Sequence, residues 1–216
     1  MKTISPLLFL ALLIASCSKD RLEADGNIVT EMRTPGTFTG VRSSGSTPVH
    51  ITYGTLYKVE LRGSGNLIPR FKSTITGSTL HLAYERVNVV HDDIEVYVTM
   101  PLLKNVDISG SGKIWVNGAF PAQQQLETRI SGSGDIYVDD TFECDAVYAD
   151  ISGSGSANLQ KINAKRSEAH ISGSGSARLS VQNNLKVRIS GSGKVYYSGS
   201  PVIDSEISGS GKVVKM

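Results

Sequence analysis

Ile108-Ser109-Gly110-Ser111-Gly112 is the first of six identical pentapeptides in this chain of 216 residues. The other five copies of Ile-Ser-Gly-Ser-Gly begin at Ile130, Ile151, Ile171, Ile189 and Ile207. Successive copies are 22, 21, 20, 18 and 18 residues apart. Such a repeat predicts a solenoid, because each unit buries its apolar side only when neighbouring units stack on it. A degenerate copy at residues 61–65, Leu-Arg-Gly-Ser-Gly, extends the pattern upstream.

The register inside each unit indicates β-strands. Every second residue of the first unit belongs to one apolar or glycine track, which is Ile108, Gly110, Gly112, Ile114 and Val116. Strict period two is the pattern of a strand. We interpret the glycines as tight bends where the backbone of one coil packs on the next and leaves no room for a side chain. The sequence therefore predicts an all-β fold, a parallel β-helix with coils of about 18–22 residues that each hold two or three short strands.

The residue before each pentapeptide forms a charged column in this arrangement. Its members are Asp107, Arg129, Asp150, His170, Arg188 and Glu206, with Glu60 before the degenerate copy. Coils of a β-helix lie about 4.8 Å apart. Opposite charges in adjacent coils favour the correct register, whereas like charges repel. We therefore interpret the column as structural.

An enzymatic alternative uses two members of the same column. Asp107 and Asp150 would lie two coils apart, about 10 Å, and inverting glycosidases separate their two carboxyl groups by roughly 6.5–9.5 Å. A carbohydrate-active enzyme, either a polysaccharide lyase or a hydrolase, is thus the alternative function. Nothing else in the sequence marks a cleft around these residues. We therefore expect a protein that is not an enzyme and assign no catalytic residue.

The amino terminus has the pattern of a bacterial lipoprotein signal. Lys2 precedes an apolar stretch at residues 7–14, which is too short to cross a bilayer as a helix. Ile14-Ala15-Ser16-Cys17 then resembles a lipobox, whose cysteine receives the lipid. We predict that Cys17 is the lipid attachment site and connects the protein to a membrane.

These signals divide the chain into three parts. We predict a lipoprotein signal peptide at residues 1–16, the lipidated cysteine and a tether at residues 17–33, and a β-solenoid head domain at residues 34–216. Ser18, directly after the cysteine, resembles the pattern of outer-membrane lipoproteins. We therefore expect an outer-membrane lipoprotein exposed at the cell surface.

Composition and charge exclude several kinds of partner. The 22 Lys and Arg residues nearly balance 20 Asp and Glu residues, and no polybasic tract is present, so we expect no nucleic acid partner. The four histidines are scattered without metal-ligand spacing, so we expect no metal and no cofactor. Cys144 is interpreted as a small packed side chain. The strand after the sixth pentapeptide has an edge that permits end-to-end association of two copies.

Aromatic residues provide the candidate binding surface. Trp115 and Tyr137 occupy the same outward position in adjacent units, and Tyr97 points outward in a strand predicted at residues 94–98. Neighbouring aromatic side chains on a rigid sheet lose little entropy when they bind a glycan or a protein ligand. Aromatic rings that stack on one another and shield the strand edges are the structural alternative.

The order of segments resembles a known family. The chain reads FTGVRSSGSTPVHITYG, LYKVELRGSGNL, TGSTLHLAYE and IEVYVTMPLLKNVDISGSGKIWV before the recurrent ISGSG. Over roughly residues 34–216 this layout resembles the putative auto-transporter adhesin family with the head GIN domain, common in lipoproteins of Bacteroidetes. The resemblance implies a right-handed single-stranded β-helix and a role in the cell envelope as an adhesin or ligand-display module. It implies no catalytic residues.

Overall fold

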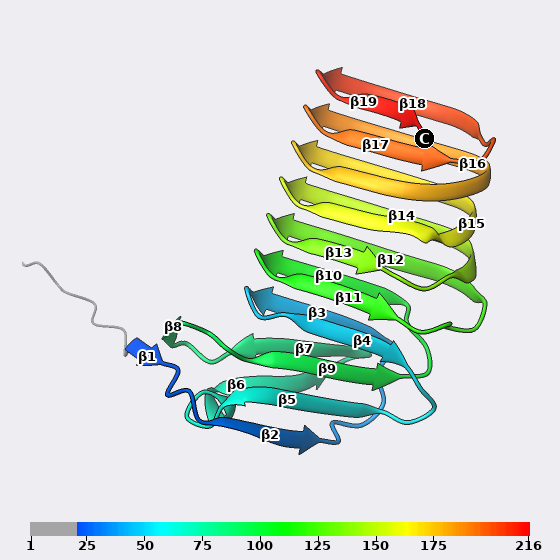
Figure 1. The fold of residues 1–216 in the computed structure, drawn as a ribbon. Coiled ribbons are helices and arrows are strands. Elements are labelled where there is room, and N and C mark those ends of the chain that lie inside the picture. The colour runs from blue at the N-terminus through cyan, green and yellow to red at the C-terminus, as the bar shows by residue number, and fades with distance from the viewer. Residues whose placement is uncertain (1–20) are drawn as a thin grey trace, which may run out of the picture.

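The computed structural model describes residues 21–216, and its strands stack into a β-solenoid of about five turns (Figure 1). The predicted signal peptide, Cys17 and Ser18 lie outside the described residues. The solenoid strands are β3 (Gly40–Gly45), β4 (Val49–Tyr53), β10 (Asn105–Gly110), β11 (Lys113–Asn117), β12 (Gln123–Gly132), β13 (Asp135–Val138), β14 (Phe142–Gly153), β15 (Ser156–Gly173), β16 (Ser176–Gly191), β17 (Lys194–Ser198), β18 (Val202–Gly209) and β19 (Lys212–Lys215).

These strands form two parallel rows that enclose the core. The motif row runs through β3, β10, β12, β14, the ends of β15 and β16, and β18. The aromatic row runs through β4, β11, β13, the starts of β15 and β16, β17 and β19. All six isoleucines of the pentapeptides lie in one register, from Ile108 paired with Ile130 to Ile189 paired with Ile207. The predicted fold class, an all-β parallel solenoid, is confirmed.

The glycine positions explain the tight bends between the rows. Gly132 has φ +124°, and a Cβ placed there would lie 2.5 Å from the carbonyl oxygen of Gly110 in the preceding coil. That same oxygen accepts hydrogen bonds of 3.0 Å from the amides of Ser133 and Gly134. A Cβ on Gly134 would lie 2.5 Å from Cγ2 of Ile108. Each bend therefore packs backbone directly on backbone, as the glycine track predicts.

The degenerate copy at residues 61–65 is not part of the stack. It lies in and directly after β5 (Lys58–Ser64), which pairs antiparallel with β2 (Ile28–Arg33) and β9 (Glu95–Met100). The segment that aligns with Ile108-Ser109-Gly110 is instead Ser43-Ser44-Gly45 of β3. Of the motif's residues in this segment, Gly45 retains the glycine with positive φ at the bend. The buried Ser43 takes the position of the isoleucine. The prediction that residues 61–65 extend the pattern upstream is therefore wrong, because the strand in register has serine in place of the aliphatic residue.

Antiparallel strands close the amino-terminal end of the solenoid. β6 (Phe71–Thr76) and β7 (Thr79–Tyr84) form a hairpin, which follows the short 3₁₀ helix η1 (Ile68–Arg70) and pairs with β3 through β7. β9 joins β5 to β4. A separate pair, β1 (Arg21–Glu23) and β8 (Asn88–Val90), lies beside this end (Figure 1).

The folded part begins before residue 34. The guanidinium of Arg33 in β2 donates hydrogen bonds to the carbonyl oxygens of Phe71 and Ile68, at 2.7 and 3.1 Å. Residues 28–33, predicted as the end of the tether, are therefore an edge strand of the sheet. Within residues 21–216, the structure contains no helix long and apolar enough to cross a membrane.

Candidate binding surface

The three predicted aromatic residues lie in one column, which begins on β9 and continues along the aromatic row. Trp115 of β11 pairs with Tyr137 of β13, and their ring centroids are 6.1 Å apart with 20° between the planes. Tyr97 of β9 does not reach Trp115, because His50 of β4 lies between them. His50 is 4.9 Å from the ring of Tyr97 and 4.8 Å from that of Trp115. We call these four residues the aromatic column.

The rings stack on one another and expose their edges. Their interplanar angles are 15°, 8° and 20°. The two spacings that involve His50 are close to the distance of about 4.8 Å between paired strands, whereas Trp115 and Tyr137 are 6.1 Å apart. All four side chains are half-buried. Because each ring face inside the column is covered by a neighbour, a sugar ring finds no open face there. The surface offered to a ligand is a ridge of ring edges with hydroxyl and N–H groups.

Carboxylates hold the tyrosine hydroxyls of the column. Tyr97 donates a hydrogen bond of 2.6 Å to Glu95, and Tyr137 donates one of 3.2 Å to Asp135. The hydrogen bond to Glu95 raises the pKa of Tyr97, while burial and then the Asp135 charge raise the pKa of Tyr137. Both phenols therefore remain protonated and uncharged.

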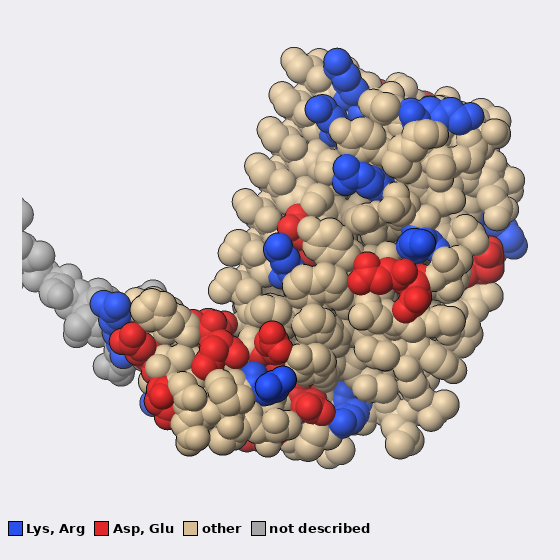
Figure 2. Space-filling model, viewed as in Figure 1, with Lys and Arg blue, Asp and Glu red and all other residues tan. Residues whose placement is uncertain are grey.

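The column continues toward the carboxyl terminus with polar and aromatic side chains. Asn158, Arg178 and Tyr196 follow Tyr137 in register. The guanidinium carbon of Arg178 lies 4.9 Å from the centroid of Tyr196. Figure 2, viewed as Figure 1, shows small separate groups of charged side chains on an otherwise uncharged face.

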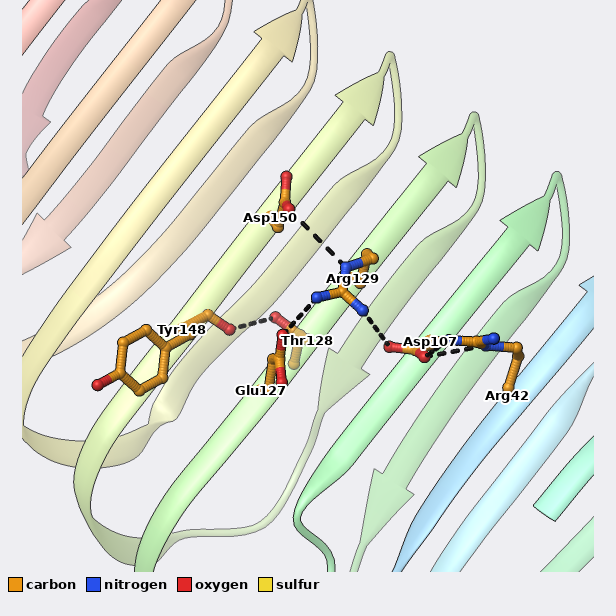
Figure 3. Close-up of polar contacts among 7 residues, drawn as sticks. All are labelled: Arg42, Asp107, Glu127, Thr128, Arg129, Tyr148 and Asp150. Atoms are coloured by element: carbon orange, nitrogen blue, oxygen red, sulfur yellow. Dashed lines mark hydrogen bonds and ion pairs between the residues drawn. The ribbon is translucent and has the colours of Figure 1, made fainter. Parts of the chain in front are cut away.

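The charged column on the motif row forms a ladder of ion pairs (Figure 3). Nη2 of Arg42 lies 2.6 Å from Oδ2 of Asp107. Arg129 lies between two carboxylates, with Nη1 3.9 Å from Oδ1 of Asp107 and Nε 3.8 Å from Oδ2 of Asp150. Arg42, and not the expected Glu60, precedes Asp107 in the column, because β3 and not β5 precedes β10 in the row.

This ladder leaves no open gap between the two carboxylates of the enzymatic alternative. The guanidinium of Arg129 fills the space between Asp107 and Asp150 (Figure 3). Asp107 is buried beneath its arginine partners. A general acid and a general base need room for substrate and water between them. The geometry therefore gives the pair a structural role.

Cys144 is part of the packing. Cys144 is buried, and burial raises the pKa of its thiol. Its thiol group donates to the carbonyl oxygen of Ala146, at 3.1 Å. Within residues 21–216, no group of three or more His, Cys, Asp or Glu side chains is arranged to hold a metal ion.

Comparison with known proteins identifies the family. The family described as "Putative auto-transporter adhesin, head GIN domain" matches residues 37–201. The chain belongs to this family. Membership in the head GIN family indicates a cell-surface or envelope protein with an adhesin or binding role. A search of the curated proteins finds no match.

Solved structures share the head GIN fold at low sequence identity. A putative adhesin from Bacteroides fragilis is 16% identical, with a TM-score of 0.72 over 90% of this chain and 100% of that one. A putative adhesin from Parabacteroides merdae is 21% identical, with a TM-score of 0.62 over 91% and 99%. A putative lipid binding protein from Parabacteroides distasonis is 19% identical, with a TM-score of 0.59 over 91% and 99%. None of these descriptions names an enzymatic activity.

Sequence reasoning missed His50 and Arg42. The alternation of residues 49–53 places His50 outward, so its orientation was readable from the sequence. The residues on either side of His50 could not be predicted, because β4 pairs with strands far away in the sequence. Val49 pairs with Val96 of β9, 47 residues later, and with Ile114 of β11, 65 residues later. The same long-range pairing brings Arg42 to Asp107.

Proposed function

We propose that this protein is a non-enzymatic lipoprotein adhesin of the outer membrane, which binds a protein ligand through the edges of the aromatic column. Residues 1–16 direct export, and the lipid on Cys17 holds the head domain at the membrane surface. The lipobox pattern and Ser18 support a location at the outer membrane. Membership in the head GIN family supports adhesion.

The observation that carries the ligand class is the stacking of the four rings. Protein interfaces are enriched in tryptophan and tyrosine, which supply large contact areas with few torsions to fix. Stacking holds the four side chains of the aromatic column in place, so they lose little conformational entropy when a ligand binds. Because the ring faces inside the column are covered, contact through the ring edges favours a protein surface over a stacked sugar.

A combined binding and turnover panel tests this function. The purified full chain is applied to immobilised proteins, to immobilised glycans and to soluble polysaccharides whose products are measured. We expect protein binding that Trp115→Ala weakens and Tyr148→Ala, on the opposite row, does not. Release of oligosaccharides that is lost in Asp107→Asn or Asp150→Asn would establish the enzymatic alternative instead.

The membrane address has a separate test. Cells that express the full chain are grown with a palmitate analogue, and the labelled protein is isolated. We expect a label that disappears in Cys17→Ala and persists in Cys144→Ala, because Cys144 is buried in the solenoid. A label that persists in Cys17→Ala would refute the lipid attachment.

A further inference from the structure

A large polar groove runs along the motif row, on a different row from the aromatic column. Its volume is about 1140 Å³. Its lining residues come from successive coils, including Arg42 in β3, Lys104 before β10, Gln125 in β12, Asp145 in β14, Arg166 in β15 and Asn184 in β16. These six positions span five steps between strands, so the groove is about 24 Å long. An adjoining hollow of about 310 Å³ shares Arg166 and Asn184 and extends it toward β18.

The groove has more cationic than anionic side chains. Arg42, Lys104, Arg129, Lys165 and Arg166 line it together with three acidic residues, Asp107, Glu127 and Asp145. Each of these carboxylates already pairs with a cation, namely Arg42, Arg129 and Lys165. Among residues 21–216, Lys104 and Arg166 form no ion pair. Two positive charges are therefore available to an anionic ligand.

Gln123, a nearly buried polar side chain that lines the groove, lacks hydrogen-bond partners. Gln123 is 6% exposed, and within the described part of the chain neither its Oε1 nor its Nε2 has a partner. Asp107 is 5% exposed; its Oδ2 accepts hydrogen bonds from Arg42, whereas its Oδ1 makes none. Buried polar atoms are nearly always paired in native proteins. These unpaired donors and acceptors point to a ligand that both donates and accepts hydrogen bonds.

The remaining polar lining consists mostly of carboxamides. Asn105, Gln124, Gln125, Asn183 and Asn184 line the groove beside Gln123. A carboxamide donates and accepts hydrogen bonds, which matches the hydroxyl groups of sugars. Guanidinium groups match the geometry of carboxylates. The combination fits a chain of sugar rings that carries carboxylates at intervals.

We propose that the polar groove binds an acidic polysaccharide laid along the solenoid axis. Lys104 and Arg166 pair with its carboxylates, and the amides of Gln123, Asn105 and Asn184 bind its hydroxyls. The site lies on the motif row and the aromatic column on the other row, so the two can bind independently. The proposal therefore does not depend on the proposed function of the aromatic column.

Calorimetry of the full chain in a neutral detergent tests the charge contribution. Polygalacturonate is the probe and uncharged dextran the control. We expect polygalacturonate to bind more weakly as salt rises, because salt screens the ionic contacts. Lys104→Gln combined with Arg166→Gln should lower the affinity about tenfold. The matched control, Lys113→Gln with Lys194→Gln, removes two charges from the aromatic row and should leave the affinity unchanged.

A second variant separates binding from folding. Gln123→Met keeps the side-chain length but removes the unpaired amide, so we expect weaker binding of polygalacturonate without a lower melting temperature. A lower melting temperature with unchanged affinity would make Gln123 purely structural and would overturn its assigned role. Equal affinities of the double variant and its control, or absence of polygalacturonate binding at low salt, would refute the proposal. Binding to phosphatidylglycerol vesicles alone would identify a lipid surface instead.

Discussion

Arg42 and Asp107 form an ion pair across 65 residues of sequence, with Nη2 2.6 Å from Oδ2. They face each other because β3 and β10 are adjacent parallel strands, although β5, β6, β7 and β9 of the amino-terminal end lie between them in the chain. The carboxylate of Asp107 is 7% exposed and the arginine side chain 43%. This pair therefore connects β3 to β10, the first strand with an Ile-Ser-Gly-Ser-Gly motif, through a nearly buried charge.

We predict that Arg42→Met destabilises the fold. The substitution leaves the Asp107 carboxylate with only Arg129, at 3.9 Å, and breaking a buried pair costs more than breaking an exposed one. We expect a loss of about 2–3 kcal/mol in the free energy of unfolding, less than for a fully buried pair because Arg42 is partly exposed. Urea unfolding measures it. Arg188→Met, whose partners Glu206 and Glu168 are 79% and 27% exposed, is the control and should cost less than about 1 kcal/mol. Equal losses would show that burial of Asp107 has no energetic consequence.

The bends provide a second prediction with a matched control. Gly132 and Gly45 both have positive φ, +124° and +107°, but an added Cβ meets the Gly110 oxygen at 2.5 Å in the first case and nothing within 4 Å in the second. Gly45→Ala should therefore cost only the backbone strain, about 1–2 kcal/mol. Gly132→Ala adds a clash between coils, about 1–3 kcal/mol more. Thermal and urea unfolding of both variants measure the difference. Identical losses would mean that the coils separate freely and that contact between backbones does not select glycine.

Local and repeated features were predictable from the sequence, and long-range pairing was not. The period-two track from Ile108 and its repetition determine the strands, their register and the adjacency of Trp115 and Tyr137. By contrast, His50 enters the column because β4 inserts between β9 and β11, which no local pattern encodes. The misplaced copy at residues 61–65 has the same cause, since partner choice and not residue type makes β5 antiparallel. The polar groove was missed because its residues lie mainly outside the repeated motif.

Acid should weaken the fold partly through Glu168. The ammonium of Lys186 lies 2.8 Å from its Oε1 and lowers the pKa of Glu168; burial opposes this shift and His170 adds to it. A lowered carboxyl pKa stabilises the fold above the pKa of the unfolded chain, about 4.3, and the contribution is lost as the pH falls through the folded value. We expect Lys186→Met to be less stable than the natural chain at pH 7 and the gap to narrow toward pH 3.

Urea unfolding at several pH values measures this gap. Lys161→Met is the control, because Lys161 forms no ion pair within the described residues, and its difference from the natural chain should not change with pH. A gap for Lys186→Met that is constant from pH 7 to pH 3 would contradict the assigned ion pair.

Trp115→Ala tests the aromatic column for stability and binding together. Trp115 stacks on His50 and Tyr137, and an aromatic pair contributes about 0.5–1.5 kcal/mol, so unfolding should become easier by about 1–3 kcal/mol. Loss of a central aromatic from a protein interface costs on the order of 1–3 kcal/mol, which lowers the affinity roughly fivefold or more.

Trp115→Phe retains a stacking ring but removes the indole edge and its N–H. If ring edges contact the ligand, Trp115→Phe should restore most of the stability while the affinity stays low. Recovery of both quantities in parallel would mean that the column only supports the fold and that the ligand binds elsewhere.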